Sequence, residues 1–133
     1  MYHGFILAGL YNLGILIFSK GLGNDLGEVD ALFDFNGCIS VLLWGAAYVA
    51  LASSYDKSPG VAMVFAVEKL FYGFHWLRWM GKHMTELPAL VKSDPLTGAF
   101  FAMYGAGDLA FMAFFAYVAC CFRRNISVGQ KAE

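Results

Sequence analysis

The stretch Val61–Met80 reads VAMVFAVEKLFYGFHWLRWM, and it combines the length of a membrane span with charges that a span seldom carries. One membrane-spanning helix requires about 20 mostly apolar residues. Four ionisable side chains nevertheless lie inside this stretch, namely Glu68, Lys69, His75 and Arg78. Because charge inside a membrane is costly and usually serves a function, the stretch predicts a transmembrane helix with an interior polar site.

The composition of the whole chain supports a membrane protein. Of its 133 residues, 59% are hydrophobic and 14% are charged, whereas soluble domains are roughly 45–50% apolar and about 25% charged. The apolar stretches lack the polar face that each helix of a soluble bundle needs. We therefore expect an integral membrane protein, and the length predicts one domain over residues 1–133.

Four apolar stretches are long enough to be considered as spans. Ser58–Pro59 and Asp94–Pro95 each pair a helix-capping side chain with a proline suited to the first helical position. Asp30 or Asp34 provides a cap for the second stretch. The predicted fold is an all-α, four-helix transmembrane bundle with both termini on the same side. The predicted spans are Gly4–Ser19, Ala31–Ser53, Pro59–Met80 and Pro95–Phe122.

The flanks of these spans say less about orientation. Lysine and arginine residues divide evenly between the two sides, so the positive-inside rule does not decide between them. Arg123–Arg124 next to the last span favours cytoplasmic termini, in a bacterial inner membrane or an equivalent one. The N-terminus lacks the basic region of a signal peptide, so we expect the first span to be retained. The connection 81–93 is either an interfacial segment or a solvated loop.

Helical spacing brings the ionisable residues together. Glu68, Tyr72 and His75 follow one another at i, i+4 and i+7 and therefore share a helix face. Glu68 lies 12 positions before Met80, and Asp108 lies 13 positions after Pro95. These separations correspond to about 18 Å and about 20 Å along a helix. Measured from the same side of the membrane, Glu68, Lys69 and Asp108 are thus predicted at one depth, near the middle of the bilayer.

Two carboxyl groups and one ammonium group cannot all be comfortably charged at that depth. We expect Lys69 to pair with Asp108 or with Glu68, which leaves one carboxyl as a binding group for a proton or a cation. Other polar residues are expected to line a pocket above this pair. The predicted binding residues are Glu68, Lys69, Tyr72, His75, Asp108, Asn12, Asn36 and Tyr104. The alternative is structural, since buried polar groups also hold transmembrane helices together.

A row of alanines occupies the face of the fourth span opposite Asp108. Small residues at this spacing allow two helices to approach closely. We interpret the row as an interface with a partner subunit, and packing within the bundle is the alternative. The partners expected besides the lipid bilayer are therefore a second copy of the chain or a larger membrane complex. The alanines are Ala99, Ala102, Ala106, Ala110 and Ala113.

Several function classes are disfavoured. The net charge of −1 and the absence of a basic stripe argue against nucleic-acid binding. The sequence contains no phosphate-binding glycine loop, nucleophile elbow or metalloprotease motif. Cys38, Cys120 and Cys121 have neither zinc-site nor disulfide spacing. No metal site is expected, because His75 and His83 would stand about 12 Å apart along one helix, and the residues indicate no particular cofactor.

Three functions remain. The first is a small non-enzymatic membrane protein that uses its buried carboxylate site to bind a lipophilic ligand, or that serves as a subunit of a larger complex. The second is a small transporter coupled to protons or cations, with Glu68 or Asp108 as the coupling acid. The third is a membrane enzyme acting on a lipid-like substrate, in which His75 and Glu68 perform acid–base chemistry.

Overall fold

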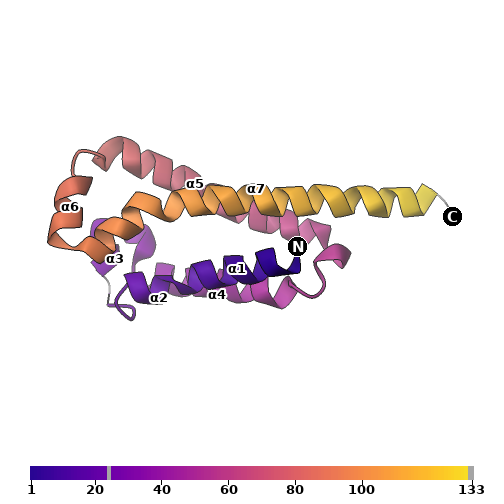
Figure 1. The fold of residues 1–133 in the computed structure, drawn as a ribbon, viewed down its shortest axis with the longest axis horizontal. Helices are drawn as coiled ribbons and strands as arrows, with labels where there is room; N and C mark the ends of the chain where they lie inside the picture. The colour runs from indigo at the N-terminus through magenta and orange to yellow at the C-terminus, as the bar shows by residue number, and fades with distance from the viewer. Residues whose placement is uncertain (24, 132–133) are drawn as a thin grey trace.

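The computed structural model describes residues 1–23 and 25–131, and over these residues the chain is helical without any strand (Figure 1). This confirms the all-α class. Two pairs of neighbouring helices make up the bundle: α1 lies along α4, and α5 lies along α7. The elements are α1 (Tyr2–Leu13), α2 (Ile15–Phe18), α3 (Asp25–Val29), η1 (Ala31–Phe33), α4 (Phe35–Leu51), η2 (Tyr55–Lys57), α5 (Pro59–His83), α6 (Leu87–Ser93) and α7 (Pro95–Lys131).

The first predicted span corresponds to α1 and α2 together. They are separated only at Gly14, whose backbone stays in the right-handed helical region and whose N–H bonds to the Leu10 carbonyl at 3.1 Å. The helix ends after Phe18, where Lys20, Gly21 and Leu22 all have positive φ angles. A left-handed backbone cannot continue a right-handed helix, so the chain turns here.

The second predicted span was wrong at its start. The expected helix from Ala31 is divided, because Asp34 is extended and separates η1 from α4. Both candidate caps are used: Asp30 Oδ1 accepts from the Leu32 N–H at 3.0 Å, and Asp34 Oδ1 accepts from the Gly37 N–H at 2.7 Å. Each carboxylate stabilises the first turn of its own helix, so one continuous helix does not form.

The third and fourth helices begin at Pro59 and Pro95, as predicted, but they end later than predicted. α5 continues past Met80 to His83, and α7 continues past Phe122 to Lys131. The ends were predicted where the apolar residues stop. The segment between Arg123 and Lys131 has no proline, however, so nothing in it terminates the helix. With 37 residues, α7 is about 56 Å long and projects beyond the bundle (Figure 1).

The connection 81–93 folds into the end of α5 and the short helix α6. Its leucines Leu87 and Leu90 are half-buried against the apolar cluster beneath, and α6 packs on the start of α7. The contact is close, because a Cβ atom at Gly98 would lie only 2.6 Å from the Val91 Cα. The connection is therefore neither a free loop nor fully buried, and it covers one end of the helix pair.

Two apolar clusters fill the interior at different levels. One contains Phe5, Tyr48, Phe65 and Phe115, and it lies at the end of the bundle where Figure 1 marks both the N and the C terminus. The other contains Ile15, Phe33, Tyr72, Phe101 and Tyr104 and lies toward α3 and α6. On each long helix, a stretch of chain separates the residues of one cluster from those of the other.

The membrane prediction is supported in part. Among the described residues, one helix is long and apolar enough to cross a membrane, the segment Pro95–Gln130 of α7. Tyr2–Phe18 and Phe35–Leu51 are apolar but shorter. α5 has 25 residues and contains the charged side chains described above. It does not qualify as a candidate membrane span.

Candidate functional site

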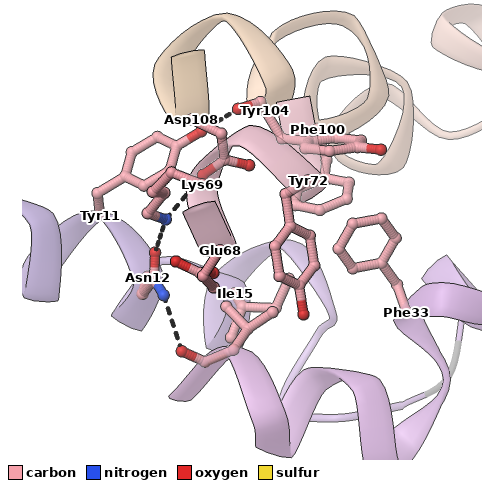
Figure 2. Close-up of a pocket in the computed structure, with 11 residues that line it drawn as sticks. Tyr11, Asn12, Ile15, Phe33, Glu68, Lys69, Tyr72, Phe100, Tyr104 and Asp108 are labelled. Carbon is pink, nitrogen blue, oxygen red and sulfur yellow. Dashed lines mark hydrogen bonds and ion pairs between the residues drawn. The ribbon is translucent and has the colours of Figure 1, made fainter. Parts of the chain in front are cut away.

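Between the two apolar clusters, four polar side chains are buried at one level. We call them the buried polar layer: Asn12 of α1, Glu68 and Lys69 of α5, and Asp108 of α7. The exposed fraction is 8% for Glu68, 1% for Lys69 and 5% for Asp108. Counting residues from Met80 and Pro95 predicted this shared depth, and the folded chain does bring the three ionisable groups together (Figure 2).

The Lys69 ammonium group is enclosed by partners. Its Nζ donates to Asp108 Oδ1 at 2.7 Å and to Asn12 Oδ1 at 2.7 Å. The rings of Tyr11 and Tyr48 lie 5.3 Å and 5.2 Å from the same nitrogen, within the range of a cation–π interaction. Lys69 and Asp108 thus form a neutral, hydrogen-bonded pair, which is the arrangement that makes a buried charge tolerable.

Neighbouring groups fix the orientation of this pair. The Asn12 amide nitrogen donates to the Val41 carbonyl at 2.9 Å, so its oxygen faces Lys69. The Tyr11 hydroxyl donates to the Tyr104 carbonyl of α7, and Gly107 leaves the room that this requires. Any Cβ atom at Gly107 would lie 2.5 Å from the Tyr11 hydroxyl oxygen. Contacts of the layer therefore reach all four long helices.

Glu68 has a different environment from Asp108. Its carboxyl group receives a hydrogen bond from the Tyr48 hydroxyl of α4, and no ion pair within 4.0 Å is formed by Glu68 among residues 1–23 and 25–131. The lysine next to it in the sequence is already held by Asp108 and Asn12. The layer consequently contains one compensated carboxylate and one carboxyl group without a cation of its own.

The empty space at the layer is small. A cavity of about 30 Å³ lies among the polar groups and the aromatic side chains above them (Figure 2). That volume is comparable with the space of one water molecule, far below the roughly 300–1,000 Å³ of a pocket for a small organic ligand. The lining residues are Tyr11, Asn12, Ile15, Phe33, Val41, Glu68, Lys69, Tyr72, Phe100, Tyr104 and Asp108.

Two predicted tyrosines lie at the cavity, although their hydroxyl groups do not join the Lys69 network. Tyr72 is buried and lines the cavity, and in Figure 2 its hydroxyl points away from Lys69. The Tyr104 hydroxyl is buried and finds no hydrogen-bond partner in the described part of the chain. Both rings belong to the apolar cluster that closes the layer on the α3 side.

Two other predicted site residues lie elsewhere, which corrects their placement. Asn36 lies in the first turn of α4, directly after the Asp34 cap and Phe35, and its side chain is exposed there. His75 is half-buried, and its Nε2 pairs with Asp30 Oδ2 at 2.6 Å. It faces a separate pocket beside η1 rather than the cavity at Glu68. Neither Asn36 nor His75 lines the cavity at the layer.

The alanine row lies where the pattern predicted it. Ala106, Ala110 and Ala113 are exposed on α7, and Ala99 and Ala102 are half-buried. The exposed part of the row is opposite Asp108, on the outer side of the helix. The row leaves an apolar surface on the helix that also projects beyond the bundle.

Sequence reasoning missed two important partners. Tyr48 was not among the predicted binding residues, and Asp30 was expected only as a helix cap. The partner of Glu68 depends on how α4 is rotated against α5, which helical periodicity within one segment does not fix. Asp30 performs two functions at once, as cap for η1 and as partner of His75.

The described residues contain no group of three or more His, Cys, Asp or Glu side chains placed to hold a metal ion. Comparison of the chain with protein-family models, with curated proteins and with solved structures finds no match in any of the three. Conclusions about function therefore rest on the geometry of the site.

Proposed function

We propose that this chain is a small, non-enzymatic integral membrane protein whose four helical segments cross the bilayer as a bundle, with Glu68 as a buried proton-binding group. The distribution of side chains supports the membrane part of this proposal. Large apolar residues cover the outside of the helices and three ionisable groups lie in the interior, whereas a soluble protein seldom buries its charged groups or exposes so many large apolar ones. Exposed examples are Leu7, Ile17, Leu43, Val67, Phe74, Leu77 and Met103.

Helix lengths are compatible with this arrangement. α4 has 17 residues and spans about 26 Å, close to the roughly 30 Å hydrocarbon core. Tyr2–Phe18 is equally long, and a short span is accommodated by local thinning of the bilayer. α5 is longer, and its charges at the layer face the interior, as intramembrane charges normally do.

One observation carries the proton-binding part: Lys69 is fully engaged by Asp108 and Asn12, so Glu68 is left without a cation. A buried carboxyl that is not compensated by a positive charge holds a proton rather than remaining ionised. A metal cation is disfavoured, because the Lys69 ammonium lines the same cavity. A lipophilic ligand would not fit into about 30 Å³. These points favour the proton-coupled alternative over the ligand-binding one.

Infrared spectroscopy of the purified protein in lipid tests the proposal. A protonated carboxylic acid has a carbonyl band of its own, and at neutral pH, where exposed carboxyl groups are ionised, we expect one such band in the wild type. Glu68→Gln should remove this band, whereas Glu86→Gln, which removes an exposed carboxyl at the start of α6, should leave it unchanged. Persistence of the band in Glu68→Gln would mean that another group holds the proton.

A second experiment connects proton binding with transport. Proteoliposomes loaded with a pH-sensitive dye should show proton movement with the wild type, and Glu68→Gln should reduce its rate to that of protein-free vesicles. Folding of the variant is checked by circular dichroism. If folded Glu68→Gln moves protons as fast as the wild type, the layer only holds the helices together.

The exposed face of α7 favours a second candidate function, that of a subunit in a larger membrane complex. Ala106, Ala110 and Ala113 leave a smooth surface for another helix. Native mass spectrometry of the complex extracted from its own membrane distinguishes a heteromeric assembly from a homo-oligomer. Ala110→Phe should dissociate either assembly. The residue next to it, Leu109, is half-buried and packs against α5 instead, so it is not part of this surface.

A further inference from the structure

A second polar pocket lies at the C-terminal end of α5, separate from the buried polar layer. Its volume is about 280 Å³. One wall consists of the last turns of α5, and the other of the segment from Val29 to Ala31. Because this segment ends α3 and begins η1, the pocket belongs to the end of the bundle opposite the two termini (Figure 1).

The α5 wall is basic. Arg78 and Lys82 stand one helical turn apart and both line the pocket. Neither makes an ion pair within 4.0 Å in the described part of the chain. The carboxylate in the pocket, Asp30, is already engaged by His75 at 2.6 Å and by the Leu32 N–H at 3.0 Å. Two fixed positive charges therefore face the pocket without a carboxylate of their own.

Trp79 adds an unsatisfied donor to the same wall. Its side chain is 8% exposed and stacks on Phe101 with ring centroids 4.7 Å apart, so the indole is held in place. Its Nε1 finds no acceptor among residues 1–23 and 25–131. A buried N–H without an acceptor is unfavourable.

The acidic residues nearby lie on the other side of Trp79. Glu28 and Glu86 line a neighbouring pocket, and Glu86 accepts from His83 Nδ1 at 3.1 Å. His83 already has this partner, and it is not counted as a ligand. Favourable charge at a helix C-terminus would by itself explain basic residues here, but not a walled pocket of about 280 Å³.

We propose that this pocket binds a phosphate group through Arg78 and Lys82. A guanidinium group forms paired hydrogen bonds with phosphate oxygens, and an ammonium group adds a point charge. In the proposed bundle the pocket lies at the membrane–water boundary, where basic pockets between helices receive phospholipid headgroups. A free phosphate ester offers the same chemistry, so both sources are tested. The site does not depend on proton binding at Glu68.

The test uses the full chain in a zwitterionic detergent and native mass spectrometry. Wild-type protein is titrated with phosphatidylglycerol and with phosphatidylcholine of identical acyl chains. We expect about thirtyfold tighter retention of phosphatidylglycerol, an effect of the size that two basic residues near an anionic headgroup produce. Arg78→Gln/Lys82→Gln should abolish this preference. Arg123→Gln/Arg124→Gln removes the same charge from the opposite end of the bundle and should keep it.

A parallel titration with inorganic phosphate identifies the source. Binding of inorganic phosphate by the wild type, lost in Arg78→Gln/Lys82→Gln, would support a free phosphate ligand, and its absence alongside the lipid preference would support a headgroup. Glu68→Gln should behave like the wild type in both titrations. Equal lipid preference in the wild type and Arg78→Gln/Lys82→Gln, or equal loss in Arg123→Gln/Arg124→Gln, would overturn the proposal.

Discussion

Among single residues, Lys69 determines the charge state of the layer, because it selects one carboxylate partner out of two. Its ammonium lies 2.7 Å from Asp108 and 2.7 Å from Asn12, and the tyrosine rings beside it occupy the remaining directions. Glu68, one position earlier on α5, relies on the Tyr48 hydroxyl instead. A difference of one residue along the helix thus separates a paired carboxylate from an unpaired one.

Removing the positive charge should be costly. Lys69→Met keeps the length of the side chain but leaves Asp108 buried without its cation, so we expect a loss of about 3–5 kcal/mol in the free energy of unfolding. The measurement is reversible unfolding in mixed detergent micelles, followed by circular dichroism.

The matched control removes both charges. Lys69→Met/Asp108→Leu leaves no uncompensated ion, and apolar side chains of similar size often replace a buried pair with little loss. We expect this double variant to recover most of the lost stability. A loss below about 1 kcal/mol in the single variant, the size typical of exposed pairs, would contradict the burial of this pair.

Sequence reasoning predicted the depth of this site better than its contacts. One proline, Pro95, and one predicted helix end, Met80, gave the level of Glu68, Lys69 and Asp108, since rise per residue is constant along a helix. The partners of each group depend on the rotation of neighbouring helices. The placement of Asn36 was wrong for a different reason. The break at Asp34 shifts the start of α4 and leaves Asn36 in an exposed first turn.

At the scale of elements, glycines set how closely the helices of each pair approach. A Cβ atom at Gly105 of α7 would lie 2.1 Å from Trp76 Cγ, and one at Gly73 of α5 would lie 2.5 Å from Leu109 Cδ2. Each glycine therefore receives a large side chain from the partner helix. The Trp76 indole N–H also donates to the Phe101 carbonyl at 2.8 Å, which ties α5 to α7.

Gly105→Ala should consequently weaken the α5–α7 pair. The added methyl group has no space unless the Trp76 ring moves, and overpacking of this kind costs about 1–3 kcal/mol. Unfolding in detergent measures the loss. Gly81→Ala is the control, because nothing lies within 4 Å of a Cβ atom there, and in a helix alanine should stabilise by about 0.5–1 kcal/mol. Equal effects of both substitutions would refute close packing at Gly105.

The connections between helices are also tied together electrostatically. Lys20 Nζ lies 2.8 Å from Asp25 Oδ2 and 2.8 Å from Asp94 Oδ2, so the end of α2 is joined to the start of α7. Hydrogen bonds from Lys20 and Thr97 lower the pKa of Asp94. Hydrogen bonds to Asp25 and Asp94 raise the pKa of Lys20 to about 12.

These shifts define a pH dependence. The contribution of Asp94 is present above the ordinary aspartate pKa of about 3.9 and is lost as pH falls through its lowered folded value. The contribution of Lys20 is present below about 10.4 and is lost as pH rises through its folded value. Asp94→Asn should therefore reduce the acid-induced fall in the unfolding midpoint, and Asp56→Asn should not. High salt should shrink the difference, since the pair is exposed.

Element boundaries were the less predictable part of the fold. The starts of α5 and α7 followed from Ser58–Pro59 and Asp94–Pro95, because a proline acts locally. Asp94 also caps α7 by accepting from the Thr97 N–H at 3.3 Å, whereas the predicted cap at Ser58 is wrong, since its side chain makes no capping hydrogen bond. The end of α7 could not be predicted from the sequence in this way. A change from apolar to polar residues alters whether a helix prefers lipid or water, but it does not end the helix. The formation of α6 likewise depends on a tertiary contact, the packing against Gly98.

For the whole molecule, the polar layer is closed on both sides by aromatic side chains. Tyr48, Phe65 and Phe115 pack toward the terminal end, and Phe33, Phe101 and Tyr104 pack toward the α3 end. Glu68 lines a cavity of about 30 Å³, comparable with the space of one water molecule. In the proposed function, proton exchange at Glu68 proceeds through this cavity and past the aromatic side chains that line it.

The same architecture predicts which chain segments are separated by the membrane. Single cysteines are introduced at exposed serine or threonine positions after Cys38, Cys120 and Cys121 have been replaced. Ser53→Cys and Ser127→Cys lie toward the terminal end, and Thr85→Cys and Ser93→Cys lie toward the α6 end. In spheroplasts of an expressing bacterium, an impermeant maleimide should label the second pair only, if the termini are cytoplasmic.

Opening the membrane should then expose the first pair to the same reagent. Labelling of all four positions in intact spheroplasts would contradict a bundle that spans the bilayer, because both ends of the long axis would then be on one side. Labelling of the first pair alone would keep the bundle and reverse its orientation. The assay therefore separates the proposal of four spans, which follows from the apolar exterior and the buried charges, from the orientation, for which Arg123–Arg124 is the main indication.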